Sequence, residues 1–107
     1  MTVNRNFAPD YGNTQTVSPA AGSTSIVIGK GSKTIRVKNA GTTNVGYFRL
    51  GLSTNGTVTA TAADMPVYPG EAVYVSKDDT WDTLAHISAA GTTFAITPGD
   101  GGVGSGG

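Results

Sequence analysis

The chain has 107 residues, no cysteine, and seven basic residues that balance seven acidic ones, giving a formal net charge of +0. This length suits one domain, and the balanced charge leaves no cation excess for phosphates, which argues against nucleic acid as a partner. The lack of cysteine excludes disulfides and cysteine-ligated zinc, and no apolar run approaches the roughly 18 residues of a membrane span, so we expect no membrane partner.

The two ends of the chain differ in pattern from its middle. Residues 1–13 predict an extended arm, because Val3 and Phe7 are spaced apolar groups in a segment that otherwise contains polar residues and a proline. Residues 99–107 (GDGGVGSGG) predict a glycine-rich tail that is flexible in isolation. Residues 14–98 between them predict a single β-domain.

Two β-like segments open this domain, residues 23–29 (STSIVIG) and 33–39 (KTIRVKN). In the second, Ile35 and Val37 alternate with two basic residues, which predicts a strand with one buried and one wet face. Between the segments, glycine permits the positive φ of a tight hairpin turn. The same turn resembles a phosphate-binding loop only in part, because Thr24 stands where that motif requires glycine.

The middle of the domain predicts three more strands, the first two of which are joined as a hairpin. Residues 44–51 (NVGYFRLG) predict a strand, and Asn55-Gly56 predicts a hairpin to another strand over residues 57–62 (TVTATA). Residues 64–70 (DMPVYPG) contain two prolines and predict a turn. Residues 71–76 (EAVYVS) alternate again and predict the next strand.

The last third predicts a polar connection at residues 78–82 and a final hairpin, in which residues 83–89 and 92–97 flank Ala90-Gly91. Seven to eight short antiparallel strands at spacings of about 8–12 residues predict an all-β, single-domain β-sandwich of jelly-roll or immunoglobulin-like type. The expected core consists of the apolar residues on the inward strand faces: Ile26, Ile28, Ile35, Val37, Phe48, Leu50, Val73, Val75, Ile87, Phe94 and Ile96.

The residues available for catalysis are few. His86 is the only histidine, and no G-x-S-x-G motif accompanies it, so a serine triad is not supported. We interpret His86 as a partly exposed strand residue. Asp64 and Glu71 flank a turn, and nothing in the pattern places them across a cleft, as a glycosidase pair requires. We therefore expect no enzymatic activity and no cofactor.

Three carboxylates cluster at Asp78, Asp79 and Asp82. Carboxylate oxygens are good ligands for calcium, but the spacing of a calcium loop and its distant glutamate are missing. The interpretation that we favour is a solvated turn in which these carboxylates cap backbone N–H groups. The sequence therefore predicts no metal site.

Aromatic residues form the remaining candidate site. Trp81 and Tyr74, with three further tyrosines, could stack on a sugar ring or a base. The alternative is that these side chains pack at the edges of the sandwich or in subunit interfaces. The aromatic residues concerned are Tyr11, Tyr47, Tyr68, Tyr74 and Trp81.

Four segments carry a resemblance: residues 34–41 (TIRVKNAG), 62–71 (AADMPVYPGE, with an Asp-x-Pro-x-x-Pro-Gly turn), 84–92 (LAHISAAGT) and 98–102 (PGDGG). In these segments the chain resembles the small accessory head proteins of tailed bacteriophages, the capsid decoration or cement proteins. The resemblance implies a non-enzymatic β-sandwich or jelly roll that binds the major capsid protein as a homo-oligomer, a trimer or dimer. It also implies synthesis in the host cytoplasm and a final location on the virion surface.

A cement protein binds the seams between capsomers, and an extended arm suits this role because it can add to the edge of a neighbouring sheet. The arm residues expected to contact the partner are Val3, Arg5, Phe7 and Tyr11, with Phe7 as an apolar anchor. An alternative function stays open, a receptor- or carbohydrate-binding β-domain of a tail fibre or spike. That alternative assigns binding to Tyr74 and Trp81.

Overall fold

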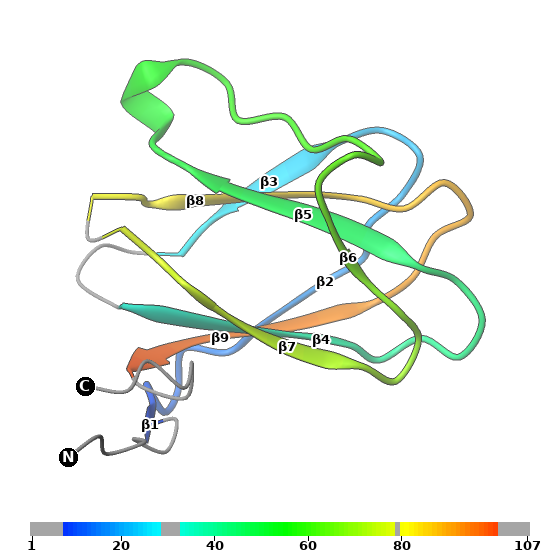
Figure 1. Ribbon diagram of the computed structural model, residues 1–107, viewed down its shortest axis with the longest axis horizontal. Helices are drawn as coiled ribbons and strands as arrows, with labels where there is room; N and C mark the ends of the chain where they lie inside the picture. The colour runs from blue at the N-terminus through cyan, green and yellow to red at the C-terminus, as the bar shows by residue number, and fades with distance from the viewer. Residues whose placement is uncertain (1–7, 29–32, 79, 101–107) are drawn as a thin grey trace, which may run out of the picture.

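The structure, a computed structural model, describes residues 8–28, 33–78 and 80–100. In this part of the chain, nine strands form two antiparallel sheets that pack face to face (Figure 1). The five-stranded sheet contains β1 (Ala8–Pro9), β2 (Gln15–Val17), β9 (Phe94–Asp100), β4 (Thr34–Asn39) and β7 (Ala72–Ser76). The four-stranded sheet contains β3 (Thr24–Val27), β8 (Thr83–Ile87), β5 (Gly46–Gly51) and β6 (Met65–Val67). The prediction of an all-β sandwich is confirmed.

The strands are arranged as four nested antiparallel pairs. β2 pairs with β9, β3 with β8, β4 with β7, and β5 with β6. The chain is thus one long two-stranded ribbon whose tip lies between β5 and β6, and successive pairs alternate between the two sheets. Pairing of β4 with β9 joins the first and third pairs into one sheet, and pairing of β5 with β8 joins the second and fourth pairs into the other. Such a fold depends on contacts between distant residues, and this predicts slow folding.

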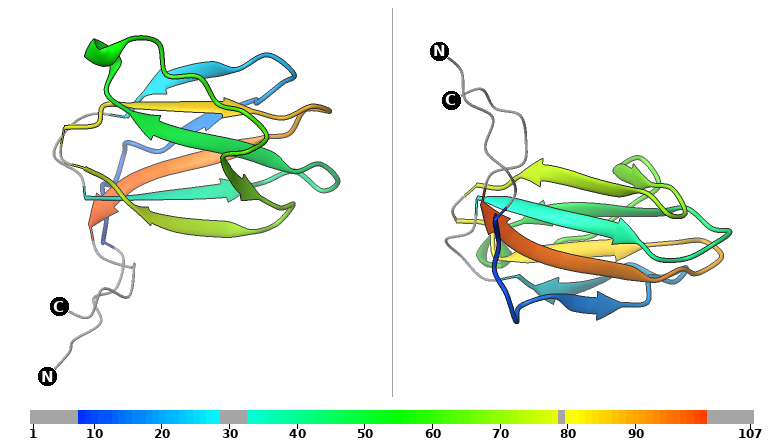
Figure 2. Two further views of the ribbon diagram at one scale, coloured as in Figure 1. Left: turned by 45° about the horizontal axis from the view of Figure 1, so that its top comes forward. Right: turned by 90° about the horizontal axis from the view of Figure 1, so that it is seen from below.

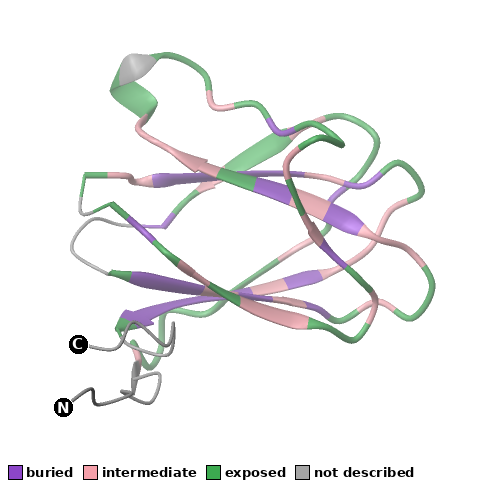
Figure 3. Cartoon of the chain, viewed as in Figure 1, coloured by how far each residue is buried: buried purple, intermediate pink, exposed green. Residues whose placement is uncertain are grey.

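The core lies between the sheets, and the alternation predicted for β4 is confirmed. Ile35 and Val37 are fully buried, whereas Arg36 and Lys38 lie on the outer face and are half-buried (Figure 3). Apolar area removed from water in this way stabilises a domain by about 25 cal/mol per Å². The buried apolar cluster comprises Ile28, Ile35, Val37, Phe48, Val67, Leu84, Phe94 and Ile96. Partly buried apolar residues packed against it are Val17, Ile26, Leu50, Val73 and Val75.

The predicted core set needs one correction on β8. Ile87 was expected inside, but Leu84 is the residue that packs in the core, and Ile87 is three residues further along the strand. Because side chains alternate along a strand, these two residues face opposite sides of the sheet. Val67 is also a core residue, although its segment was predicted to be only a turn.

The predicted final hairpin at Ala90-Gly91 is wrong, since β8 and β9 belong to opposite sheets. The turn predicted at residues 29–32 lies outside the described residues, but β3 and β4, which it joins, are also in opposite sheets. The hairpin interpretation of that connection is therefore wrong too. These connections cross between the layers instead of joining neighbours in one sheet.

The hairpin predicted at Asn55-Gly56 is also wrong, because residues 57–62 form no strand and β5 pairs with β6. A single 3-10 turn, Ser53–Asn55, diverts the chain. The carboxylate of Asp82 holds that turn by accepting hydrogen bonds from Ser53 N, at 3.0 Å, and Ser53 Oγ, at 2.9 Å. The loop 52–64 then lies over the outer face of the four-stranded sheet (Figure 1), where Ala60 N donates to Ser23 Oγ.

Asn39, at the end of β4, is a fully buried polar residue that joins four segments. Its Nδ2 donates to the carbonyl oxygens of Asn44 and Val67, both at 2.9 Å. Its Oδ1 accepts from Gly41 N at 2.9 Å and from Thr92 Oγ1 at 2.6 Å. Because a buried amide is costly unless its hydrogen bonds are satisfied, this arrangement fixes the loops at one end of the sandwich.

The two predicted terminal segments are attached at one end of the sandwich. Ala8 pairs with Asp100, and Pro9 pairs with Gly99, so β1 lies beside the last residues of β9 (Figure 2). Part of the predicted arm and part of the predicted tail are therefore strand residues. No helix among the described residues is long and apolar enough to cross a membrane.

Candidate functional site

The structure separates the predicted binding residues into three groups. Val3, Arg5 and Phe7 lie outside the described residues. Tyr11 and Tyr74 line one pocket on the outer face of the five-stranded sheet. Trp81 lines a different pocket, beside β5.

The Tyr11–Tyr74 pocket (Pro9, Tyr11, Gly12, Thr14, Arg36, Tyr74 and Thr97) has a volume of about 520 Å³. Its floor is a row of outward-facing residues, because Arg36 on β4 is paired with Tyr74 on β7 and with Thr97 on β9. The turn after β1 adds Tyr11, which is 87% exposed. Tyr74 is 41% exposed, so both aromatic rings are accessible at the pocket.

Arg36 is held in place within this row. Its Nε donates to Tyr74 Oη at 3.2 Å, and its guanidinium carbon lies 5.9 Å from the centre of the Tyr74 ring. The second distance is within the range of a cation–π interaction. The hydroxyls of Thr14 and Thr97 share a hydrogen bond of 2.8 Å. The pocket therefore combines an oriented cation, two aromatic rings and two hydroxyl groups.

The outer face of the five-stranded sheet is positively charged around this pocket. Arg36 and Lys38 are the outward basic residues of β4. The residues paired with them on the flanking strands are uncharged, and comprise Ala72 and Tyr74 on β7 and Ala95 and Thr97 on β9. Among the described residues, Arg36 forms no ion pair with a carboxylate. In the described part of the chain, neither of these two basic side chains has a carboxylate within ion-pair distance.

The aromatic platform proposed for Trp81 and Tyr74 is not formed by these two residues. Trp81 lines a pocket of about 280 Å³ with Arg49, Leu50 and Thr57. Tyr74 lines the separate pocket on the other sheet. Tyr11, which the sequence placed in the arm, is the aromatic partner that the structure brings near Tyr74.

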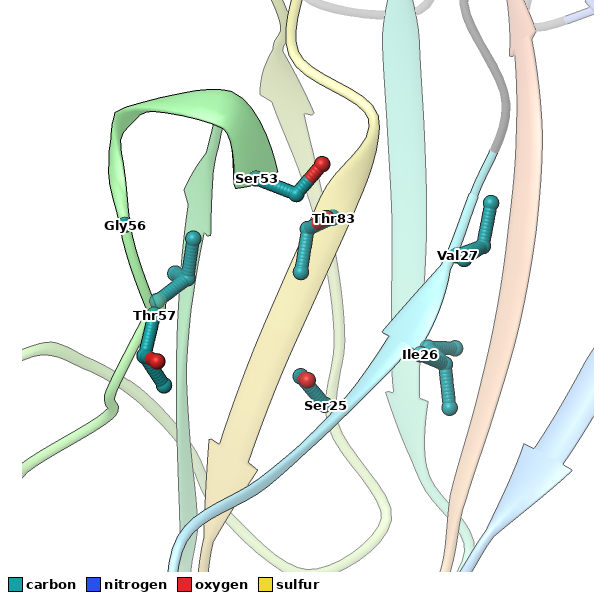
Figure 4. Close-up of a pocket in the computed structure, with 8 residues that line it drawn as sticks. Ser25, Ile26, Val27, Ser53, Gly56, Thr57 and Thr83 are labelled. Atoms are coloured by element: carbon teal, nitrogen blue, oxygen red, sulfur yellow. The ribbon is translucent and has the colours of Figure 1, made fainter.

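A third pocket, of about 460 Å³, lies between loop 52–64 and the four-stranded sheet (Figure 4). Its polar lining consists of the hydroxyl groups of Ser25, Ser53, Thr57 and Thr83. Ser53 Oγ and Thr83 Oγ1 both donate to the carboxylate of Asp82, at 2.9 Å each. These two hydroxyls are committed to holding the loop, and none of the described residues that line the pocket is titratable.

The predicted acidic cluster caps backbone groups. Asp78 accepts from Thr80 Oγ1 at 2.6 Å and from Thr80 N at 2.8 Å, and these bonds lower its pKa. Hydrogen bonds from the backbone and hydroxyl of Ser53 and from Thr83 lower the pKa of Asp82 from 3.8 to about 2. The prediction that these carboxylates cap local backbone groups is confirmed for Asp78, whereas Asp82 caps a backbone group of a distant segment, at Ser53. Asp79 lies outside the described residues.

His86 lies in a strand, as predicted, but it is buried and not partly exposed. Only 3% of its surface is accessible, and Nδ1 lies 3.3 Å from Thr24 Oγ1. It faces inward because it is paired with the core residue Phe48 on β5. Burial lowers its pKa, which favours the neutral ring.

Asp64 and Glu71 have separate structural roles. Asp64 Oδ1 pairs with Arg49 Nη2 at 2.9 Å, and Asp64 Oδ2 accepts from Thr61 N at 2.7 Å. Glu71 Oε1 accepts from Tyr68 N at 3.0 Å. Each carboxylate therefore orders its own loop.

Within residues 8–28, 33–78 and 80–100, no group of three or more histidine or acidic side chains could hold a metal ion. Comparison of the chain with protein-family models and with curated proteins gave no match. The pocket between Tyr11 and Tyr74 is therefore the strongest candidate binding site on structural grounds.

Proposed function

We propose that this protein is a non-enzymatic structural protein of a phage virion, which binds the outer surface of the capsid and stabilises the shell. The observation that carries the proposal is the pairing of Ala8 with Asp100. The first and last described residues therefore lie side by side at one end of the sandwich. We propose that this end faces the capsid and that Val3, Arg5 and Phe7, which precede Ala8 in the chain, make the contacts.

The finer fold that we propose is an eight-stranded jelly roll. The strand orders β2-β9-β4-β7 and β3-β8-β5-β6, with β1 as an addition, support it. In that architecture a long antiparallel ribbon is rolled so that its pairs alternate between two sheets. Jelly rolls are common in viral capsid proteins and lectins, so the fold fits a virion component without specifying its role.

The use of the polar side chains also supports a role without catalysis. Asp64, Asp78 and Asp82 hold loops, and the one histidine is buried against Thr24. An acid–base pair needs titratable groups within reach of a substrate. In the described part of the chain these groups are already committed to structure.

The mechanism that we propose is additive. Each copy binds the major capsid protein at a weak seam and contributes a few kcal/mol, and many copies act together through multivalency. Association of the sandwiches into a homo-oligomer, a trimer or dimer, would multiply the contacts per particle. The low content of charged residues, 13%, offers little electrostatic repulsion between neighbouring copies.

The direct test adds the purified full chain to expanded heads of the phage that encodes it, and measures the temperature at which DNA is released. We expect saturable binding and a higher release temperature. Phe7→Ala should weaken binding about 30-fold or more, because truncating an interface anchor typically removes 2 kcal/mol or more. Fluorescence-labelled protein that sediments with the heads gives the affinity.

The matched control is Tyr68→Ala, which removes a tyrosine that is 57% exposed in the turn between β6 and β7. This variant should bind heads like the unaltered protein. Absence of binding to expanded heads would contradict the proposal. Equal losses in the Phe7 and Tyr68 variants would contradict docking by the arm.

A further inference from the structure

The Tyr11–Tyr74 pocket has properties that binding to a capsid by the arm does not require. Its volume of about 520 Å³ falls in the usual range of small-molecule sites, roughly 300–1,000 Å³. Such sites combine apolar or aromatic walls with a few polar groups that set orientation. Here Tyr11 and Tyr74 provide the rings, and Arg36 provides the charge.

The guanidinium of Arg36 is already oriented for a ligand. The hydrogen bond from Nε to Tyr74 Oη fixes the side chain. The terminal nitrogens of Arg36 make no ion pair with a described carboxylate. Because the guanidinium group carries parallel N–H donors, it binds a carboxylate with two hydrogen bonds. An ordered side chain loses less conformational entropy when the ligand arrives.

The pocket floor favours recognition through side chains. β4 is hydrogen-bonded to β7 on one side and to β9 on the other. Its backbone groups at Arg36 are therefore committed to the sheet, and an added peptide strand cannot pair with them. The hydroxyl pair of Thr14 and Thr97 leaves lone pairs that can accept from ligand hydroxyl groups.

From this combination we propose that the pocket binds an acidic sugar residue, one that carries a carboxylate on its ring. Arg36 binds the carboxylate, Tyr11 and Tyr74 contact the apolar C–H faces of the sugar ring, and Thr14 and Thr97 contact its hydroxyls. A single cation in the pocket matches a monoanion. The proposal goes beyond capsid binding, and gives the virion a second contact, with an acidic polysaccharide.

The test is a titration of the ¹⁵N-labelled full chain, followed by NMR, with a tetrasaccharide of β-1,4-linked glucuronate. We expect saturable shifts at Arg36, Tyr74 and Thr97 and along the turn at residues 11–14. The matching neutral tetrasaccharide of glucose should bind at least tenfold more weakly. Arg36→Gln should reduce the affinity for glucuronate about tenfold or more, because it removes the charge-assisted pair.

The matched control is Lys38→Gln, which removes an equal charge from the same outer face of β4 but does not line the pocket. Its affinity should change less than threefold. Tyr11→Ala tests the aromatic wall from a residue in a turn, and should also weaken binding. Thermal melting of each variant shows that the loss does not come from unfolding.

Four outcomes would overturn the proposal. The first is no saturable binding of glucuronate, and the second is equal affinity for the neutral sugar. The third is an equal loss of affinity in the two Gln variants. The fourth is tighter binding of an acetylated Gly-Asp-Gly peptide, which would identify a protein carboxylate as the ligand. Capsid binding by the Arg36 variant is measured in parallel, so that failure of this site and failure of the proposed function are distinguished.

Discussion

The outer faces of the two sheets differ in how their side chains are used. On the four-stranded sheet, loop 52–64 covers the surface, and Ala85 on the outer face of β8 is fully buried. The charged pair Arg49–Asp64 holds that loop. On the five-stranded sheet, Arg36 and Tyr74 lie at an open pocket. One face is therefore closed by its own chain, and the other is available to a ligand.

This difference shows how one fold supports both stability and recognition. The polar groups around loop 52–64 satisfy each other, so substitutions there should act on folding. At the Tyr11–Tyr74 pocket, Arg36 is oriented by Tyr74 but forms no ion pair with a described carboxylate. Substitutions there should therefore act on binding. Substitutions in the interior, at the closed face and at the open face should separate effects on folding from effects on binding.

The largest effect is expected for Asn39→Ala. The substitution removes four hydrogen bonds. It leaves the buried carbonyl of Val67 without that partner, and likewise the part-buried groups Thr92 Oγ1 and Gly41 N. We expect the free energy of unfolding to fall by about 3 kcal/mol, since each unsatisfied buried group costs about 1–3 kcal/mol. Urea denaturation measures the change.

Asn13→Ala is the control, because Asn13 is exposed and its side chain, among the described residues, bonds only to Asp10 Oδ2. Its effect should stay within about 0.5 kcal/mol. Similar small losses in both variants would show that Asn39 does not join the loops as described.

An intermediate effect is expected from pH at the closed face. The pKa of Asp82 is about 2 in the folded chain against an ordinary value of 3.8. A lowered pKa means that this group stabilises the fold fully above pH 3.8, and that its contribution is lost as the pH falls toward 2. Urea denaturation between pH 5 and pH 2 should show the loss.

Asp82→Asn should remove most of this loss in the free energy of unfolding between pH 5 and pH 2. Ser53→Ala should remove only part of it, because the backbone donor remains. An unchanged acid profile in the Asn variant would contradict the proposed anchoring of loop 52–64 by Asp82.

The smallest effect on stability is expected at the open face. Arg36→Gln and Tyr11→Ala should each change the free energy of unfolding by less than about 1 kcal/mol, because exposed cation–π contacts contribute about 0.5–1 kcal/mol. Urea denaturation is again the measurement. A loss comparable to that of Asn39→Ala would show that these residues are structural, and the contrast between the faces would fail.

The sequence predicted the fold class and the strand faces where the pattern is strictly periodic. In β4, alternation of apolar and basic residues identified Ile35 and Val37 as buried. In β8 the alternation is weak, since Leu84 and Ile87 are both apolar and lie on opposite faces. Sequence periodicity could not choose between them, and burial depends on which residue meets the other sheet.

Strand connections were not predictable from local turn chemistry. Gly91 has a φ of +87°, as a tight turn requires, but the turn joins strands of opposite sheets. Glycine permits the same backbone conformation in both cases. The choice is made by pairing between residues far apart in sequence.

The candidate site was found only in part. The sequence predicted Tyr11 as a contact residue of the arm and Tyr74 as part of a platform with Trp81, whereas it indicated Arg36 only as part of a wet strand face. Its proximity to Tyr74 follows from the register of β4 against β7, which no short motif encodes. The sequence did contain one signal for this site, which was an outward arginine in an alternating strand together with tyrosines elsewhere in the chain.

An electron cryo-microscopy reconstruction of expanded heads with the chain added back would show directly where the sandwich attaches. We expect density for the sandwich attached through the end where β1 lies beside β9, with the outer face of the five-stranded sheet and its Tyr11–Tyr74 pocket open to solvent. Attachment through loop 52–64, or heads without added density, would contradict this expectation.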